Sequence, residues 1–311
     1  MTEKDVKDIL IIGGGTAGMT AALYALRAGN SIEIIENYVH GGQIIVSHEV
    51  ENYPAIPGIT GADFAIKLFE QVENLGMKMR YENIAEIDLT SEIKTLKTAK
   101  NEYYGKTVII ATGSARKTLK VLGESKFSGR GVSYCATCDG AFHKGKPVAV
   151  VGGGNTALED AIFLAKTSSV VYLINRSNEF NGDDLLIKTA LETPNIEVMY
   201  NSQIMEIRGD KTVTGISVMN GNTNQAVDLE LGGVFIAVGV LPNSNIFADV
   251  IDIDEKGYII SGEDCHTNVE GVFAAGDCRT KTLRQLVTAA ADGAVAATEA
   301  SKYIIKQRRK K

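Results

Sequence analysis

The chain has 311 residues, of which 44% are hydrophobic and 23% are charged, and its formal net charge is −6. This composition is typical of a globular protein and excludes the disordered and fibrous classes. The acidic balance also provides no overall field that would attract nucleic acid or an anionic membrane. Because single hydrophobic cores stop growing at about 250 to 300 residues, we expect two domains.

The start of the chain and its cysteines favour a cytosolic protein. The first apolar run covers only residues 9–12 and follows a charged start, which is not the form of a signal peptide. No segment approaches the ~20 apolar residues that a membrane-spanning helix needs. Four cysteines in so long a chain do not suit the disulfide framework of a small secreted domain, so a close pair indicates redox chemistry or a metal.

The N-terminal segment alternates between strands and a helix. We expect a buried parallel strand at residues 8–12, an alanine-rich helix at residues 19–28 that Gly29 closes, and a second strand at residues 31–36. The same order recurs later, with strands at 148–151 and 170–174 around a helix at 157–166, so the chain contains an internal repeat.

A glycine motif joins the first strand to the first helix. Gly13, Gly15 and Gly18 form G-x-G-x-x-G, which lets the backbone approach a pyrophosphate that faces the helix N-terminus. Glu36 lies 18 residues beyond Gly18, at the end of the second strand, where a carboxylate can accept hydrogen bonds from a ribose. A glycine turn without a ligand is the alternative, but the full context favours a dinucleotide site.

Cys135 and Cys138 form a C-x-x-C pair between the two repeats, and Asp139 follows directly. Such a pair can close a small disulfide, and the motif commonly lowers one thiol pKa so that a thiolate attacks disulfides. The neighbouring carboxylate can carry the proton. Half of a zinc site is the alternative, but no second C-x-x-C exists, and the histidines His40, His48, His143 and His266 lack ligand spacing.

The second repeat carries its own glycine motif. Gly152, Gly154 and Ala157 fit G-x-G-x-x-A in the same strand–loop–helix setting, which implies a second dinucleotide. Counting 23 residues from Gly152 reaches Asn175, as 23 from Gly13 reaches Glu36, so the ribose position of the second unit has no acid. Asn175 followed by Arg176 permits NADPH without requiring it.

Apolar strands at residues 107–113 and 233–239 close the two nucleotide-binding sheets, and the linker-like segments 113–117 and 241–245 follow them. A strand at residues 271–275 and a helix through residues 289–300 complete the chain. We therefore expect an α/β fold of two Rossmann-like dinucleotide-binding domains, the second inserted into the first. The boundaries place residues 1–116 and 246–311 in a first, discontinuous dinucleotide-binding domain and residues 117–245 in a second one, which carries the cysteine pair.

In combination, these motifs resemble low-molecular-weight thioredoxin reductase over nearly the whole chain. The motifs that carry the resemblance are Gly13-Gly-Gly-Thr-Ala-Gly18, Gly41-Gly-Gln43, Glu51-Asn-Tyr-Pro54, Ala111-Thr-Gly113, Cys135-Ala-Thr-Cys-Asp139, Gly152-Gly-Gly-Asn-Thr-Ala157, Gly276-Asp277 and Arg284-Gln285. The resemblance implies a homodimeric flavoprotein in which two domains alternate between two orientations, with the linker-like segments as hinges.

The resemblance also implies roles for individual residues. Cys138 would lie nearest the flavin, Cys135 would attack thioredoxin, and Asp139 would donate a proton. Arg130 and Phe142 resemble positions that meet thioredoxin, although Ala141 stands where family members often carry another aromatic residue. The FAD contacts would be Gly13, Gly15, Thr16, Ala17, Gly18, Glu36, Gly42, Gln43, Asn52, Ala111, Thr112, Gly113, Gly276, Asp277, Arg284, Gln285 and Leu286. The NAD(P) contacts would be Gly152, Gly154, Asn155, Thr156, Glu159, Asn175, Arg176 and Gly239.

The second nucleotide site departs from the family at one place. The family's 2′-phosphate motif reads H-R-R-x-x-x-R, whereas residues 175–181 read N-R-S-N-E-F-N, which leaves Arg176 as the cation. Charge-assisted hydrogen bonds to a phosphate contribute about 1.5–3 kcal/mol each, so their loss weakens selection of NADPH over NADH.

The sequence thus predicts a thioredoxin-disulfide reductase that passes a hydride from NADPH or NADH to FAD, then to the cysteine pair, and finally to thioredoxin. Two alternatives stay open: a disulfide reductase of the same fold fed by another donor such as ferredoxin, and a flavin redox sensor that turns nothing over. We expect no metal, nucleic acid or membrane partner.

Overall fold

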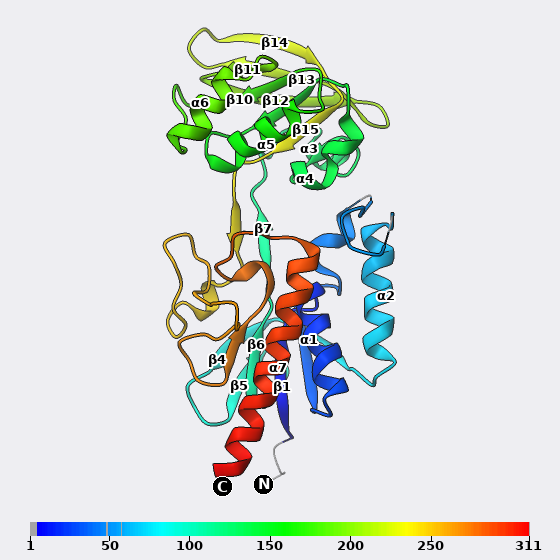
Figure 1. Cartoon of the computed structure of the whole chain (residues 1–311), viewed down its shortest axis with the longest axis vertical. Coiled ribbons are helices and arrows are strands. Elements are labelled where there is room, and N and C mark those ends of the chain that lie inside the picture. The colour runs from blue at the N-terminus through cyan, green and yellow to red at the C-terminus, as the bar shows by residue number, and fades with distance from the viewer. Residues whose placement is uncertain (1–4, 48, 57, 311) are drawn as a thin grey trace. The chain divides into compact units, whose positions relative to one another are not determined.

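The computed structural model describes residues 5–47, 49–56 and 58–310 and divides the chain into two compact units (Figure 1). Unit 1 comprises Met1–Ala115 and Leu241–Lys311, and unit 2 comprises Arg116–Val240. Both joints lie in a two-stranded ribbon formed by β7 (Ser114–Arg116) and β16 (Val240–Pro242). Unit 2 is therefore inserted into unit 1 through a pair of adjacent strands.

The sheet of unit 1 has the order β3-β2-β1-β6 in its parallel part, and β17 pairs in parallel with the far end of β6. Towards its start, β6 pairs antiparallel with β5, and β5 with β4. The strands are β1 (Val6–Ile12), β2 (Ile32–Glu36), β3 (Met79–Tyr81), β4 (Ile84–Asp88), β5 (Lys94–Thr98), β6 (Glu102–Ile110) and β17 (Val272–Ala274).

Both faces of this sheet are covered, because successive side chains of a strand point to opposite faces. Ile9 and Ile11 of β1 enter one core, which helices α1 and α7 complete. Leu10 and Ile12 enter the other core, with Phe247 among their neighbours. The continuous apolar run in the sequence therefore reflects a strand buried on both sides.

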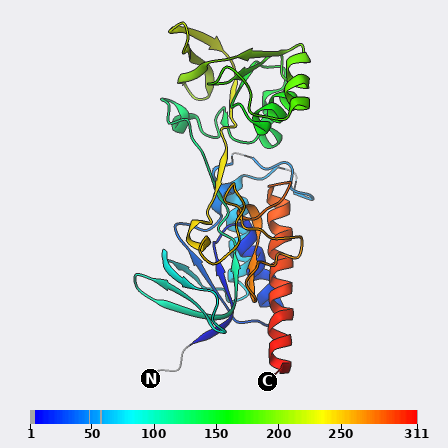
Figure 2. The ribbon, with the colours of Figure 1, turned by 90° about the vertical axis from the view of Figure 1, so that its left-hand side faces the viewer.

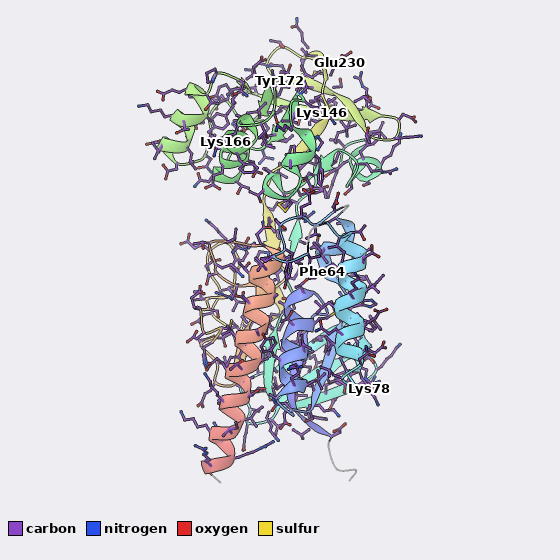
Figure 3. All side chains as sticks on the ribbon, turned by 45° about the vertical axis from the view of Figure 1, so that its right-hand side comes forward. Phe64, Lys78, Lys146, Lys166, Tyr172 and Glu230 are labelled. Carbon is purple, nitrogen blue, oxygen red and sulfur yellow. A yellow bond between two sulfur atoms is a disulfide. The ribbon has the colours of Figure 1, made fainter. Side chains whose placement is uncertain are left out.

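Long helices pack along one face of unit 1. Figure 2 shows α7 running along this unit, and it packs against α1, β6 and β17. Phe64 of α2, labelled in Figure 3, packs against Tyr53 with ring centroids 5.2 Å apart, which anchors the loop before α2. The helical segments are α1 (Thr16–Arg27), η1 (Gly42–Val46), α2 (Gly61–Glu73), η3 (Asn245–Phe247), η4 (Gly276–Cys278) and α7 (Leu286–Lys310).

Unit 2 contains a parallel sheet of order β11-β10-β9-β15-β8 and an antiparallel sheet of order β12-β13-β14. Val148 and Val150 of β9 pack towards α5, while Ala149 and Val151 pack towards the antiparallel sheet. The elements are β8 (Val132–Ser133), β9 (Val148–Val151), β10 (Val171–Ile174), β11 (Ile196–Met199), β12 (Ser202–Gly209), β13 (Val213–Asn220), β14 (Gln225–Glu230), β15 (Gly233–Ile236), α3 (Glu124–Phe127), α4 (Ala136–Asp139), η2 (Gly140–His143), α5 (Asn155–Ala165) and α6 (Asp184–Glu192).

The internal repeat is confirmed, since β1–α1–β2 and β9–α5–β10 have the same order and parallel pairing. The expected helix starts at residues 19 and 157 are wrong by a few positions. The helices begin at Thr16 and Asn155, directly from the glycine loops. The strand expected at residues 107–113 ends at Ile110, because the chain turns away at the small residues that follow.

Candidate functional site: a redox disulfide and two nucleotide loops

Cys135 and Cys138 form a disulfide with their Cα atoms 5.3 Å apart. Cys135 follows β8 in an extended conformation, and α4 begins at the next residue. This single helical turn brings the two sulfurs together, and both cysteines are half-buried. A disulfide in this position can accept two electrons and release two thiols.

Ser133 connects the acid of the motif to the disulfide. Its hydroxyl donates to Asp139 Oδ2 at 2.5 Å and accepts from the backbone N–H of Cys135 at 3.1 Å. The backbone N–H of Asp139 donates to the Cys135 carbonyl at 3.1 Å, which closes the turn. The sequence analysis identified Asp139 but missed Ser133, because only the turn brings these two residues together.

Two further titratable groups lie on elements beside this turn. His143 of η2 packs edge-on against Phe235, and burial, followed by the nearby charge of Lys146 (Figure 3), lowers its pKa, which favours the neutral imidazole. Asp160 lies on α5, which packs against α4. Burial and then the charge of Glu159 raise the pKa of Asp160 to about 7. No motif points to Asp160 beyond its place next to Glu159.

The first glycine loop forms the tight turn that its motif predicts. A Cβ on Gly18 would lie 1.9 Å from the carbonyl oxygen of Gly13, so only glycine allows α1 to start this close to the loop. Gly15 precedes α1 without a side-chain cap, and the first turn carries no acid. The N–H groups at this helix end are therefore available to an anion.

Glu36 lies beside this loop, as its position at the end of β2 predicts. Its Oε2 accepts from the Gly14 N–H at 2.6 Å, and its Oε1 accepts from the Tyr38 N–H at 2.9 Å. A carboxylate oxygen has a second lone pair, so each oxygen retains the capacity to accept from a ribose hydroxyl. The loop and the acid together fit the adenosine diphosphate half of a dinucleotide.

Other residues implied for FAD contact one another in the fold. Gly15 bridges to Gly41, the neighbour of Gly42, and a Cβ on Gly13 would collide with the Ala111 carbonyl at 2.4 Å. Asn52 Nδ2 donates to Gln285 Oε1 at 3.0 Å. These contacts connect segments that are far apart in the sequence.

Arg284 provides a further test of the fit. Its guanidinium carbon lies 3.9 Å from the centre of the Tyr258 ring, and its buried Nε has no hydrogen-bond partner within the described residues. A buried donor of this kind usually has a partner. Oxygen acceptors of a bound flavin would satisfy it, so the residues of unit 1 fit FAD.

The second glycine loop leads into its helix as the first one does, but Asn175 occupies the position that Glu36 has in the first unit. Gly154 precedes α5 without a side-chain cap, and the first turn of α5 carries no acid. Asn175 is buried and occupied by its own loop: its Oδ1 accepts from the Ser177 N–H at 3.2 Å, and its Nδ2 donates to the Glu179 carbonyl at 2.7 Å. Asn175 therefore shapes the loop, which limits what it offers to a ribose.

The loop that follows Asn175 folds back over the glycine loop. The Asn181 N–H donates to the Gly153 carbonyl at 2.7 Å, and the Asp183 N–H donates to Asn155 Oδ1 at 2.8 Å. Arg176 is exposed, as are Asp183 and Asp184 at the start of α6. The two acids therefore add negative charge to the segment that folds over the second glycine loop. Sequence reasoning had not connected Asn181 or Asp183 to the glycine loop.

Comparison with known proteins assigns this arrangement to a family. The family model described as pyridine nucleotide-disulphide oxidoreductase matches residues 7–293. The chain belongs to this family. The pyridine nucleotide-disulphide oxidoreductase family implies the use of a flavin and a nicotinamide nucleotide, in agreement with the two glycine loops.

Several relatives of this oxidoreductase are thioredoxin reductases. The chain is 43% identical to the thioredoxin reductase of Peptoclostridium acidaminophilum, covering 97% of this chain and 98% of the relative. It is 39% identical to the Bacillus subtilis enzyme, covering 98% and 96%. The crystal structure of the Streptococcus pyogenes thioredoxin reductase matches with a TM-score of 0.94 at 38% identity, covering 98% of this chain and 100% of that one. These findings confirm the resemblance and the predicted fold class.

Within the described residues, no cluster of three or more His, Cys, Asp or Glu side chains could hold a metal ion, and His48 lies outside those residues. None of the described helices combines the length and apolar character needed to cross a membrane.

Proposed function

We propose that this protein is a thioredoxin reductase that moves electrons from a nicotinamide nucleotide, through FAD, to the Cys135–Cys138 disulfide and on to thioredoxin. The observation that carries the proposal is the disulfide itself, joined to Asp139 through Ser133 in a chain with two dinucleotide loops. The similarity to thioredoxin reductases over nearly the whole chain supports it.

Unit 1 would hold FAD. The N-terminus of α1 and Gly15 would receive the pyrophosphate, and Glu36 would accept from the adenosine ribose. Asp277, Arg284 and Gln285 would face the flavin half. When bound, FAD accepts a hydride from a nicotinamide and delivers two electrons to a disulfide.

Opening the Cys135–Cys138 disulfide consumes two electrons and, at the thiol stage, two protons. Cys138 would be the sulfur that receives electrons, and Cys135 would attack the thioredoxin disulfide to form a mixed disulfide, which Cys138 then resolves. Asp139 would supply and recover the proton that each change of thiol state requires. Ser133 holds the carboxylate of Asp139 next to the backbone of Cys135.

Unit 2 would bind the nicotinamide nucleotide at Gly152, Gly154 and the N-terminus of α5, with Glu159 towards the nicotinamide. The donor would be NADPH or NADH with weak discrimination. Arg176 can pair with a 2′-phosphate, but Asp183 and Asp184 oppose it. The cation cluster that would select NADPH strongly is missing from residues 175–181.

The partner would be thioredoxin or a thioredoxin-like protein, and the enzyme would act as a cytosolic homodimer. Arg130 and Phe142, both exposed, are the residues we assign to thioredoxin contact. The ribbon of β7 and β16 would be the hinge, because both joints between the units lie in it.

Stopped-flow mixing with NADPH or NADH under anaerobic conditions tests this function. We expect rapid bleaching of the oxidised flavin, followed by reduction of added thioredoxin. Bleaching without transfer to any disulfide would support a redox sensor instead. Reduction of the flavin by ferredoxin but by neither nicotinamide would replace the proposed donor.

A further inference from the structure

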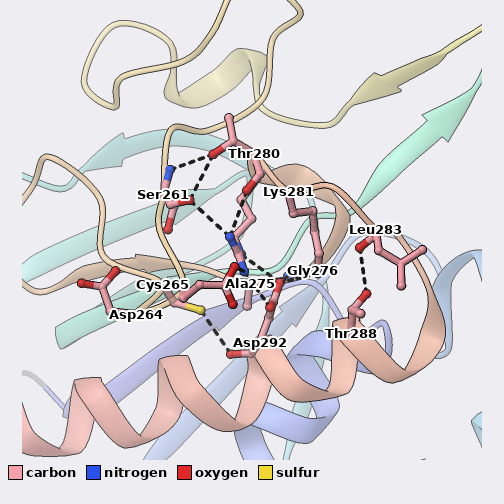
Figure 4. Close-up of polar contacts among 12 residues, drawn as sticks. Ser261, Asp264, Cys265, Ala275, Gly276, Thr280, Lys281, Leu283, Thr288 and Asp292 are labelled. Carbon is pink, nitrogen blue, oxygen red and sulfur yellow. Dashed lines mark hydrogen bonds and ion pairs between the residues drawn. The ribbon is translucent and has the colours of Figure 1, made fainter. Parts of the chain in front are cut away.

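A buried ion cluster joins Asp292 of α7 to Arg279 and Lys281 of the loop after η4, and we call these three residues the Asp292 cluster. Figure 4 labels Asp292 and Lys281. Arg279 donates from Nε to Asp292 Oδ2 and from Nη2 to Asp292 Oδ1, both at 2.9 Å. Lys281 Nζ donates to Asp292 Oδ2 at 2.7 Å. Arg279 Nη1 donates to the carbonyls of Ser261 at 3.2 Å and Thr280 at 2.9 Å.

The charges of this cluster are well shielded from water. Arg279 is 2% exposed and Asp292 is 6% exposed. Burial alone would raise the pKa of Asp292, but the hydrogen bonds from Arg279 and Lys281 keep it below its ordinary value. Two cations thus share one carboxylate. Burying charges is costly, and an apolar core of equal volume is often as stable, so stability alone is a weak reason for this cluster.

The cluster is connected directly to the segment assigned to FAD. Asp292 Oδ2 also accepts from the backbone N–H of Gly276 at 2.9 Å, which fixes the residue before Asp277. The carbonyl of Arg279 accepts from Arg284 Nη2 at 3.2 Å. One carboxylate therefore holds Gly276, directly before Asp277, and also Arg279, whose carbonyl accepts from Arg284.

Residues beside this cluster also pack against the first turn of α1, next to the first glycine loop. A Cβ on Gly293, the neighbour of Asp292, would lie 2.2 Å from the Ala17 carbonyl oxygen. A Cβ on Gly276 would lie 2.9 Å from the Ala17 Cβ. Since Ala17 belongs to the first turn of α1, α7 and η4 are pressed against the end of the helix that faces the pyrophosphate. Displacement of Gly276 or Asp292 would therefore disturb the first turn of α1.

We propose that Asp292 is a positioning residue for FAD: it holds Gly276 and Arg279 so that Asp277 and Arg284 meet the flavin and α1 meets the pyrophosphate. This inference rests on the proposed function, because it takes FAD to be the ligand of unit 1. Asp292 itself acts through these neighbours, from within the core.

Asp8 provides a matched control within the same unit. It is also a buried carboxylate, 7% exposed, and it accepts from Lys106 Nζ at 2.7 Å and Arg308 Nη2 at 3.2 Å. It lies near the start of β1, whereas the glycine loop follows the end of that strand. Asp8→Asn removes a comparable buried charge far from the FAD loop along the strand.

The experiment compares Asp292→Asn with Asp8→Asn in the full-length chain. Apoprotein of each is prepared, its thermal midpoint is recorded, and it is titrated with FAD by flavin fluorescence. We expect the FAD dissociation constant to rise at least tenfold in Asp292→Asn and to stay within threefold of wild type in Asp8→Asn. The visible spectrum of the remaining bound flavin should also shift only in Asp292→Asn.

Arg279→Lys keeps the test decisive if Asp292→Asn does not fold. It retains the charge but cannot form two parallel hydrogen bonds to Asp292, so we expect a three- to tenfold weaker FAD affinity. Equal FAD affinity in wild type, the folded Asp292 or Arg279 variant and Asp8→Asn would overturn the positioning role. A wild-type chain that binds no FAD would instead overturn the proposed function.

Discussion

At the scale of single residues, the hydroxyl of Ser133 connects the acid of the redox turn to the backbone of the turn. It connects Asp139 Oδ2, at 2.5 Å, with the backbone of Cys135, at 3.1 Å. General acid–base catalysis depends on a proton donor held within hydrogen-bond reach. We predict that Asp139→Asn slows thioredoxin reduction on the order of 100-fold, and that Ser133→Ala slows it about tenfold, because the carboxylate is present but no longer held.

The measurement is the rate of disulfide interchange with thioredoxin between pH 6 and 9, starting from prereduced enzyme. Ser133→Thr keeps the hydroxyl and should restore most of the rate. The flavin spectrum should be unchanged in all three variants. A Ser133→Ala enzyme with the wild-type rate and pH profile would remove Ser133 from the mechanism.

Asp160 gives unit 2 a pH-dependent stability. Its folded pKa of about 7 lies above the unfolded value of 3.8, because burial and Glu159 disfavour the charged form. The folded state therefore favours the proton, and stability falls as pH rises from about 4 to 7 and then levels off. We predict that Asp160→Asn stabilises the protein by about 1–2 kcal/mol at pH 8, allowing for partial solvation, and by less at pH 5.

Urea unfolding at pH 5 and pH 8 measures this difference. Asp184→Asn, at an exposed position of α6, controls for the loss of a negative charge. An Asp160→Asn variant with equal effects at both pH values would contradict the raised pKa.

The sequence predicts the cysteine pair and its neighbouring acid, but not the residues that contact them in the fold. Cys135, Cys138 and Asp139 are adjacent in the chain, and their spacing alone carries the chemistry. Ser133 and Asp292 act through contacts that only the folded chain creates, and neither has a motif of its own. Asn175 shows the reverse case: its position matches Glu36, but its amide groups are used within its own loop.

At the scale of elements, we expect the loop of residues 175–181 to determine how strongly the second nucleotide site binds a 2′-phosphate. Both Ser177 and Asn181 have exposed side chains, while their backbone N–H groups hold the loop together. Arginine at these positions therefore leaves the backbone contacts intact. We predict that Ser177→Arg with Asn181→Arg shifts preference towards NADPH, mainly through KM, and that wild-type kcat/KM values for the two nucleotides lie within ~100-fold, or ~2.7 kcal/mol.

Steady-state kinetics with both nucleotides at two salt concentrations measures this shift, since a surface phosphate–arginine pair weakens with ionic strength. Asn178→Arg adds a cation in the same loop outside the family positions, and it should have a smaller effect. A wild type that prefers NADPH by well over 100-fold would show that cations elsewhere bind the phosphate.

Elements whose residues form a clear local pattern can be predicted from the sequence. The strand at Val148–Val151 was placed correctly because a short β-branched run between turn residues has few alternatives. The antiparallel sheet β12-β13-β14 was not identified, because its strands read as mixed polar and apolar segments whose pairing depends on the rest of unit 2. Helices α2 and α6 were missed, although Thr60 and Asp183 are ordinary N-caps that accept from Asp63 N and Leu185 N.

At the scale of the whole molecule, each unit has the means to fold by itself. Unit 1 has cores on both faces of its sheet, and unit 2 has cores on both faces of its parallel sheet. Unit 2 is one continuous segment, whereas unit 1 is made of two. Since β7 and β16 are paired, the ends of unit 1 at Ala115 and Leu241 lie close together. Insertion at such a site interrupts unit 1 without disturbing its core.

We therefore predict that each unit, prepared separately, folds and binds its own nucleotide. Residues 116–240 expressed alone should fold, contain the Cys135–Cys138 disulfide and bind a nicotinamide nucleotide, but should not reduce that disulfide with it.

Residues 1–115 joined to residues 241–311 by a short glycine–serine linker should bind FAD, because all the residues assigned to FAD lie in these segments. Dithionite should bleach this flavin, and NADPH or NADH should not. Absorbance of the flavin, thiol counts and nucleotide titration measure these outcomes. A linked unit 1 that folds but binds no flavin would show that residues of unit 2 contribute to the FAD site, and bleaching of its flavin by either nicotinamide would show that the nucleotide does not depend on unit 2.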